Sequence, residues 1–300
     1  MGRRVSNSKD EMDKILDKLD GLPTLPGIVH ELDKIISNPQ SSASDVSKVL
    51  ERDQSLAAKV LRMVNSAYYS IPGGISDLKR AITYLGNDTL KQLILTTSVF
   101  KNLNKTNTGQ QFDLMAFWKH TVGVAMTAEA LAKWAKYTNP STCFTAGLLH
   151  DIGKVALYHF APQYLDSISE SAKKQNLTML EVELTSKAVP HTVLGAKLAR
   201  IWGLPVAIEL AITCHHEPDL KKRPSSLSND TNALIDIVYL ANLLIHQLEF
   251  GNSGHSKNET INPDALKRIQ IYPPQLPLIF KDINRALTTC DDFIRAISQP

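Results

Sequence analysis

Cysteine is scarce in this chain of 300 residues, which contains only Cys143, Cys214 and Cys290. Because their number is odd and their spacing is wide, the sequence argues against a disulfide framework of the kind that supports small secreted domains. Cys143 and Cys214 are more typical of small buried side chains. We therefore expect a protein of the reducing cytoplasm.

Long apolar runs and a strong charge imbalance are also missing. No stretch approaches the ~18 uncharged apolar residues that span a membrane, and Arg3 and Arg4 are not followed by the apolar segment of a signal peptide. The net charge is only +3, from 33 basic and 30 acidic residues. A dedicated nucleic-acid binder usually carries a strong basic patch. The sequence therefore predicts no membrane partner and argues against a nucleic-acid partner.

Segments that alternate between apolar and polar residues, as half-buried strands do, are not present in quantity. Apolar residues recur instead at helical spacing, for example at Leu78, Ala81, Ile82 and Leu85, and Gly86 follows this stripe as a predicted C-cap. The sequence therefore predicts an all-α protein.

The polar segment 104–111 carries no large apolar residue and is the best candidate boundary between two helical halves. The chain then divides into a leader with the first helix (1–20), an N-terminal helical subdomain (21–103), a helical core with a candidate metal site (112–250), and a loop with a C-terminal helical tail (251–300). Within the core, one helix is expected from Thr142 to Tyr158. Residues 251–260 are predicted to form a surface loop.

The most informative stretch is Gly147-Leu148-Leu149-His150-Asp151-Ile152-Gly153-Lys154, which places a histidine beside an aspartate in an apolar, glycine-flanked segment. Burying two ionisable groups costs several kcal/mol unless a charge or hydrogen bonds compensate. A bound cation compensates most simply, because a neutral imidazole and a carboxylate are both metal ligands. Further candidate ligands are His120, His191 and the pair His215-His216. The alternative interpretation of the doublet alone is a hydrogen-bonded buried pair at a helix start.

Adjacent residues on a helix point about 100° apart, so His150 and Asp151 converge poorly on one ion if both lie within a helix. The difficulty eases if two neighbouring ions share the site. A carboxylate bridges two ions readily and a neutral imidazole does not, so Asp151 is the expected bridging ligand. Nitrogen and oxygen ligands together suit Fe, Mn, Zn or Ni better than Ca or Mg. We therefore expect one or two divalent transition-metal ions as the cofactor.

Several short motifs accompany the histidines. They are Leu22-Pro23-Thr24-Leu25-Pro26, Asp53-Gln54-Ser55-Leu56-Ala57-Ala58-Lys59-Val60-Leu61, Asn65-Ser66-Ala67-Tyr68-Tyr69, Ala81-Ile82-Thr83-Tyr84-Leu85-Gly86, Ala146 to Gly153, Gly195-Ala196 and Trp202-Gly203-Leu204-Pro205. With these motifs, residues 21–250 together resemble the HDOD family, the HD-related output domain of bacterial signalling proteins, within the HD superfamily of metal-dependent phosphohydrolases. The resemblance implies a two-lobed helical protein in which the N-terminal subdomain packs on an HD-type helical core.

Carried over by position, the superfamily's metal ligands fall on His120, His150, Asp151, His191, His215 and His216. The family's closing aspartate should lie in an Ala-Asp pair on a late helix, where this chain has Ala241-Asn242. Asn242 can offer a carbonyl oxygen but no charge, and such a loss typically weakens a site by a few kcal/mol. Asp236 lies six residues before Asn242, off the required face, and is a poor substitute. The Gly-Tyr-Pro element that marks the cyclic-di-GMP hydrolase branch is also missing.

Two hypotheses of function remain open. The first is a signalling protein that keeps an HD-type metal site with weak or no activity and acts through contacts with other signalling proteins. The second is an active metal-dependent phosphohydrolase acting on a nucleotide or phosphodiester, in which Asp151 bridges the ions and Lys154 steadies the anionic phosphate. Lys154 is equally typical of a surface lysine. The remaining histidines are predicted to be structural or solvated: His30, His159, His246 and His255.

Overall fold

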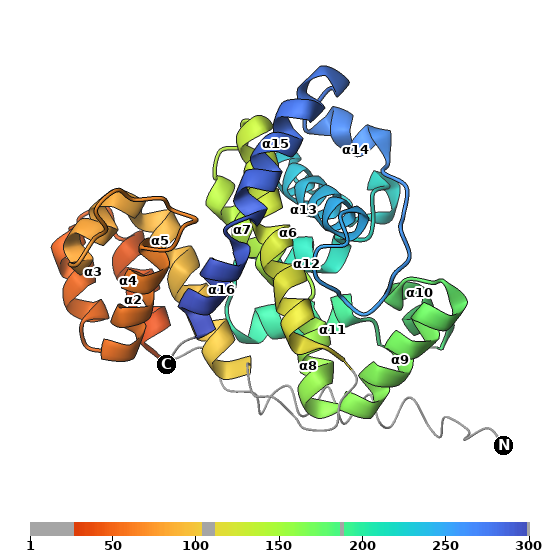
Figure 1. Cartoon of the computed structure of the whole chain (residues 1–300), viewed down its shortest axis with the longest axis horizontal. Helices are drawn as coiled ribbons and strands as arrows, with labels where there is room; N and C mark the ends of the chain where they lie inside the picture. The colour runs from red at the N-terminus through yellow and green to blue at the C-terminus, as the bar shows by residue number, and fades with distance from the viewer. Residues whose placement is uncertain (1–26, 104–111, 187–188, 299–300) are drawn as a thin grey trace.

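The computed structural model describes residues 27–103, 112–186 and 189–298, and every regular element in these ranges is helical (Figure 1). The prediction of an all-α protein is therefore confirmed. The predicted leader and the predicted boundary at 104–111 lie outside the described residues. Within the described part, no helix is both long and apolar enough to cross a membrane.

Among the described residues, four helices form the N-terminal lobe, drawn in orange in Figure 1. They are α2 (Gly27–Ser37), α3 (Ala43–Leu50), α4 (Gln54–Val64) and α5 (Leu78–Leu103). Gly86 has φ +75° and ψ 169° inside α5, outside the helical region. The predicted C-cap thus ends one helical segment, and a second begins directly after it. Glycine is favoured here because it adopts positive φ without a steric penalty.

The second lobe is built around α6 and α7, which pack against each other and against α13. Its helices are α6 (Leu114–Trp134), α7 (Pro140–Leu149), α8 (Ile152–Phe160), α9 (Pro162–Gln175), α10 (Met179–Thr185), α11 (His191–Ile201), α12 (Val206–Cys214) and α13 (Asn229–Gln247). The Asp113 side chain caps α6 by accepting a hydrogen bond from the Ala116 backbone N–H. Trp118 and Trp202 are buried in the apolar core.

The prediction of one continuous helix from Thr142 to Tyr158 is wrong. α7 ends at Leu149 and α8 begins at Ile152, so the His150-Asp151 doublet lies at a break between two helices. A Cβ atom at Gly153 would lie 1.9 Å from the backbone oxygen of His191. Only glycine therefore lets the start of α8 approach the start of α11 this closely. The break removes the constraint that adjacent residues on one helix point apart.

The expected surface loop at 251–260 is also partly wrong, because Ser253, Gly254 and His255 are buried. The Asn252 backbone N–H donates to the Ala116 carbonyl of α6 over 2.9 Å. Gly251 has φ +75°, and a Cβ atom there would lie 2.3 Å from the His120 backbone nitrogen. The glycines thus allow the start of this segment to lie directly against α6 beside His120.

The C-terminal helices are integrated into the fold and do not form a detached tail. They are α14 (Pro263–Arg268), α15 (Leu276–Leu287) and α16 (Cys290–Ser298), with a short 3₁₀ turn at Pro273–Gln275; another 3₁₀ turn, Leu220–Lys222, lies between α12 and α13. α16 packs against α4 and α5 of the first lobe and α6 of the second (Figure 1). The Phe293 ring lies 5.6 Å from that of Tyr68 and 5.8 Å from that of Phe144. One buried side chain therefore joins the cores of the two lobes.

Candidate metal centre

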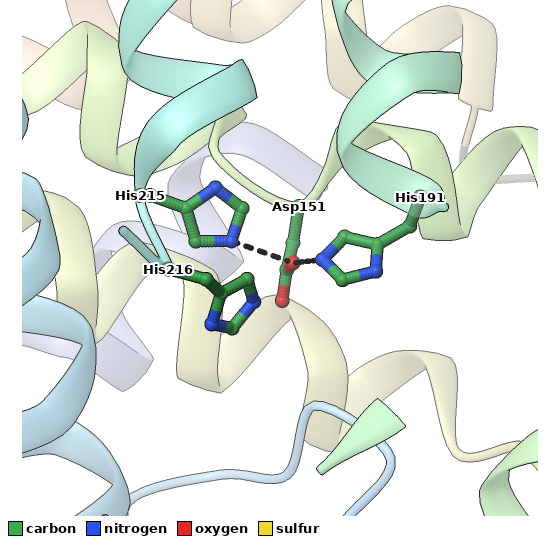
Figure 2. A group of neighbouring side chains, drawn as sticks. All are labelled: Asp151, His191, His215 and His216. Atoms are coloured by element: carbon green, nitrogen blue, oxygen red, sulfur yellow. Dashed lines mark ion pairs between the residues drawn. The ribbon is translucent and has the colours of Figure 1, made fainter. Parts of the chain in front are cut away.

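The Asp151 carboxylate lies at the centre of a buried cluster formed by the α7–α8 break and the ends of α11 and α12 (Figure 2). Its Oδ1 oxygen is 3.2 Å from Nε2 of His191 and 3.5 Å from Nε2 of His215. Its Oδ2 oxygen is 3.3 Å from Nε2 of His150 and 2.7 Å from Nζ of Lys154.

Two overlapping groups of side chains could each hold an ion. In the first, ligand atoms of Asp151, His191, His215 and His216 all lie within 4.8 Å of one another. In the second, ligand atoms of His120, His150 and Asp151 do the same. The structure therefore brings together six of the seven predicted ligands. The seventh, Asn242, is not part of either group. Asp151 belongs to both groups, which is the position required of a bridging carboxylate.

Hydrogen bonds to backbone carbonyls fix how the imidazoles of His150 and His215 face Asp151. Nδ1 of His150 lies 2.6 Å from the Gly147 carbonyl, and Nδ1 of His215 lies 2.8 Å from the Ile212 carbonyl. A carbonyl only accepts, so each Nδ1 donates, and in the neutral ring Nε2 is left as a lone pair facing Asp151. These backbone contacts are typical of metal-binding histidines, whose second nitrogen is held by an outer partner.

His191 is held by a buried carboxylate. Oε2 of Glu183 accepts from both the His191 backbone N–H (3.1 Å) and Nδ1 (2.7 Å). Burial lowers the pKa of His191, but the charge of Glu183 outweighs this and raises the pKa above its ordinary value. Glu183 thus orients the ring and makes it more basic, which strengthens a nitrogen ligand.

Several polar atoms in the cluster have no hydrogen-bond partner among the described residues. They are Nε2 of His150, His191, His215 and His216, and Oδ1 of Asp151. Burial lowers the pKa of His215 to about 4, so its Nε2 is an unprotonated acceptor at neutral pH. Burial raises the pKa of Asp151, but its polar surroundings, the charge of Lys154 first among them, outweigh this and hold it well below its ordinary value. Acceptors that face acceptors repel, and a cation between them removes the repulsion, so this donor set fits a transition metal.

Lys154 is buried and its Nζ donates to Oδ2 of Asp151 (2.7 Å) and to the Ser253 carbonyl (3.1 Å). It is therefore no surface lysine, and its expected contact with a phosphate remains a prediction. Asn242 is also buried, with Oδ1 3.1 Å from Nε2 of His120. The predicted seventh residue thus lies beside the cluster, where its amide oxygen already contacts a histidine.

Asp236 lies outside the cluster, as the sequence predicted. Its carboxylate accepts from Arg223 (2.5 Å) and Arg268 (2.7 Å). This buried ion-pair network connects α13 and α14 to the segment that follows His216. Asp236 therefore does not replace the aspartate that the family pattern places at position 242.

Sequence reasoning missed four residues around the cluster: Glu183, Ser253, His246 and His255. The ring of His246 lies 4.6 Å from that of His120 and stacks on His255 at 4.3 Å. His246 follows Asn242 by one helical turn, and this spacing was the available signal. Glu183 and Ser253 carry no comparable spacing signal, because each approaches the cluster only through the tertiary fold.

The geometry agrees with a family assignment from sequence. The HDOD domain matches residues 22–218. The chain belongs to the HDOD family. It is also 26% identical over 262 residues to an uncharacterized protein of Treponema pallidum, covering 87% of this chain. The matched part of this chain corresponds to 48% of the length of that relative, about half.

Solved structures share the fold. An HDOD domain protein of unknown function from Geobacter sulfurreducens is 26% identical, with a TM-score of 0.70 and coverage of 97% of this chain and 93% of that one. A protein from Shewanella amazonensis, described as a candidate phosphohydrolase, is 23% identical with a TM-score of 0.69, covering 93% and 97%. A protein from Marinobacter aquaeolei, described as a candidate signal transduction protein, is 19% identical with a TM-score of 0.73, covering 98% and 66%.

Proposed function

We propose that this HDOD protein is a cytoplasmic signalling regulator whose His/Asp cluster binds one divalent transition-metal ion and has little or no hydrolytic activity. The single observation that carries the assignment of one ion and weak hydrolysis is the buried ion pair between Lys154 and Asp151. The two ligand groups share Asp151, and Lys154 already neutralises the oxygen that faces His150. The two groups therefore differ in the negative charge that they offer to a cation.

The ion is assigned to the group of Asp151, His191, His215 and His216. This set offers three imidazole nitrogens and one carboxylate oxygen, which matches the ligand preference of Fe, Mn, Zn or Ni. When bound, such an ion supplies Lewis acidity and holds the helices that carry its ligands together. Glu183 keeps the His191 ring directed at Asp151, and the Ile212 carbonyl does the same for His215.

The second group is unfavourable for a second ion. It contains two histidines and the shared Asp151, and a second cation here would lie close to the Lys154 ammonium. Asn242 contributes no negative charge to offset this repulsion. Hydrolysis of phosphate esters by two-ion sites relies on both ions to stabilise the attacking and leaving oxygens. A two-ion mechanism is therefore unfavourable at this site, and we expect hydrolysis to be weak or absent.

A second candidate function, an active metal-dependent phosphohydrolase, is favoured by the completeness of the six-residue cluster. The Shewanella amazonensis protein described as a candidate phosphohydrolase also has this fold. In this alternative, Lys154 leaves Asp151 when substrate binds and contacts a phosphate oxygen of a nucleotide or phosphodiester.

Elemental analysis and a hydrolysis assay test the proposal together. We expect about one transition-metal ion per chain in protein purified without chelators, lost in Asp151→Asn and kept in the exposed control Asp291→Asn. A content below ~0.2 ion per chain in the native protein overturns metal binding. We expect no turnover of phosphodiesters or nucleotides with added Mn or Fe. Turnover that Asp151→Asn abolishes and Asp291→Asn retains overturns the inactivity and establishes the alternative.

A further inference from the structure

The His/Asp cluster is almost completely closed to solvent. Asp151 and Lys154 are each 1% exposed, and His150, His191 and His215 are fully buried. If the cluster binds a metal ion, as its proposed function requires, an ion from solution has to reach these buried ligand atoms. Some part of the fold must therefore move aside to let the ion enter or leave.

Residues 251–258, which follow α13, form a strap over one side of the cluster. The Ser253 carbonyl accepts from Nζ of Lys154 over 3.1 Å, and the Ser253 Oγ lies 3.1 Å from Nε2 of His246. The His255 ring of the strap stacks on that of His246 with 4.3 Å between the centroids. Ser253 is fully buried and His255 is 3% exposed. The strap therefore covers the cluster where Lys154 meets Asp151.

A hydrogen bond and an ion pair hold the strap against α9 and α10, past which it runs in Figure 1. The Gly254 carbonyl accepts from Oγ of Ser169 in α9 over 2.7 Å. Nζ of Lys257 donates to both carboxylate oxygens of Glu181 in α10, over 2.6 and 2.8 Å. A Cβ atom at Gly254 would lie 2.3 Å from Sδ of Met179, so the backbone of the strap lies directly against α10.

The composition of the strap makes it easier to displace than the helices around it. Residues 251–258 contain no aliphatic or phenyl side chain, whereas Phe250 before them and Ile261 after them pack against the apolar core. Lifting the strap returns little apolar surface to water, so its cost is mainly the loss of polar contacts. Segments with few apolar contacts are the ones that open locally at low free energy. The middle of the strap can therefore lift while both ends stay anchored.

We propose that the strap gates the His/Asp cluster: it lifts between Phe250 and Ile261 to let a metal ion pass and closes over the cluster afterwards. Lifting takes the Ser253 carbonyl away from Nζ of Lys154 and opens the Lys154–Asp151 pair to solvent. The closed strap keeps both a bound ion and any phosphate ester from exchanging with solution. The identity of what passes rests on the proposed function, whereas the opening itself is a property of the metal-free chain.

Modification of His255 by diethyl pyrocarbonate in the metal-free full chain measures the opening, with the exposed His30 as internal reference. Ser169→Ala removes a hydrogen bond to the strap and should raise the rate at His255 about 3–10-fold. Ser167→Ala, an exposed control on the same helix, should leave it unchanged. A native rate that does not rise with low urea identifies local opening. A rate that follows global unfolding, or equal rates in Ser169→Ala and the native chain, overturns the proposal.

Removal of the bound ion by excess EDTA provides a second measurement. Lys257→Met, which breaks the ion pair with α10, should release the ion about two- to fivefold faster than the native chain. Lys267→Met, at an exposed ion pair of α14, should release it at the native rate. Faster modification of His255 without faster release overturns the gate and places the entry beside the partly exposed His216. Faster modification in a chain that binds no metal overturns the proposed function but supports the opening of the strap.

Discussion

Nζ of Lys154 lies 2.7 Å from Oδ2 of Asp151, inside a cluster from which both side chains are almost completely withdrawn from solvent. The ammonium group therefore stands where a second cation would have to bind beside His150. If the cluster binds metal as proposed, this ion pair favours one ion over two. A single substitution of Lys154 can therefore test how many ions the cluster binds.

Lys154→Met tests the ion pair directly. Removing one partner of a buried pair leaves an uncompensated charge, so the metal-free variant should lose about 3–5 kcal/mol of unfolding free energy. Added Mn or Fe should restore stability, and the bound metal should rise from about one ion per chain toward two. Chemical unfolding and elemental analysis measure these effects. Lys174→Met, at an exposed ion pair, is the control with a change of at most about 1 kcal/mol. Unchanged metal content in folded Lys154→Met would contradict the blocked second group.

Glu183→Gln should weaken metal binding without removing a ligand. Its carboxylate holds Nδ1 of His191 at 2.7 Å, and loss of such an outer partner typically costs about 10–100-fold in metal affinity. Competition with a fluorescent chelator measures the change. The exposed Glu170→Gln variant should bind metal as the native chain does. Native affinity in Glu183→Gln would show that the Glu183 charge does not strengthen His191 as a ligand.

Asn242→Asp should restore the charge that the family pattern places on α13. Its carboxylate would accept a charge-assisted hydrogen bond from Nε2 of His120, which now lies 3.1 Å from the amide oxygen. We expect tighter binding of a second ion and a gain of phosphodiester turnover over the native chain. Asn232→Asp, earlier on the same helix, should show no gain. Failure of Asn242→Asp to change either quantity would locate the loss of activity elsewhere.

The metal-free protein should become less stable as pH falls. Burial lowers the pKa of His215 to about 4, of His246 to about 3 and of His255 to about 2, against about 6.5 when unfolded. At pH values between the folded and unfolded pKa, the unfolded chain binds more protons than the folded chain. The free energy of unfolding therefore has its full value above about pH 6.5 and declines below it. His191, with a raised pKa, acts in the opposite sense.

Urea unfolding with a chelator, from pH 7.5 to 4.5, measures this dependence. The slope should be shallower in His215→Gln and unchanged in His30→Gln, whose side chain is exposed. Stability that stays constant or rises on acidification would contradict neutral burial of the histidines.

Gly153→Ala tests the close approach of α8 to α11. The added Cβ would lie 1.9 Å from the His191 carbonyl, so the backbone must shift. We expect a loss of at least about 3 kcal/mol and reduced metal content, because the shift separates His191 from Asp151. Gly27→Ala, where nothing lies within 4 Å, should be neutral or slightly stabilising. Melting temperatures distinguish the two.

Much of the fold could be predicted from sequence because helical periodicity and capping are local. The C-cap at Gly86 is an example. The grouping of five further predicted ligands around Asp151 followed instead from the family resemblance. The break after Leu149 could not be predicted, because Ile152 and Val155 continue the apolar pattern and the cause is the contact of Gly153 with a distant helix. Ser253 was assigned to a surface loop because its neighbours are polar, yet its carbonyl accepts from Lys154.

The packing of Phe293 between Tyr68 and Phe144 has a consequence for how the chain folds. Because α16 lies beyond the family match at residues 22–218 yet contributes to both cores, neither lobe buries its full apolar surface until the last helix docks. These contacts join residues more than a hundred positions apart, which raises the contact order and slows folding. The two lobes should therefore unfold in one cooperative transition.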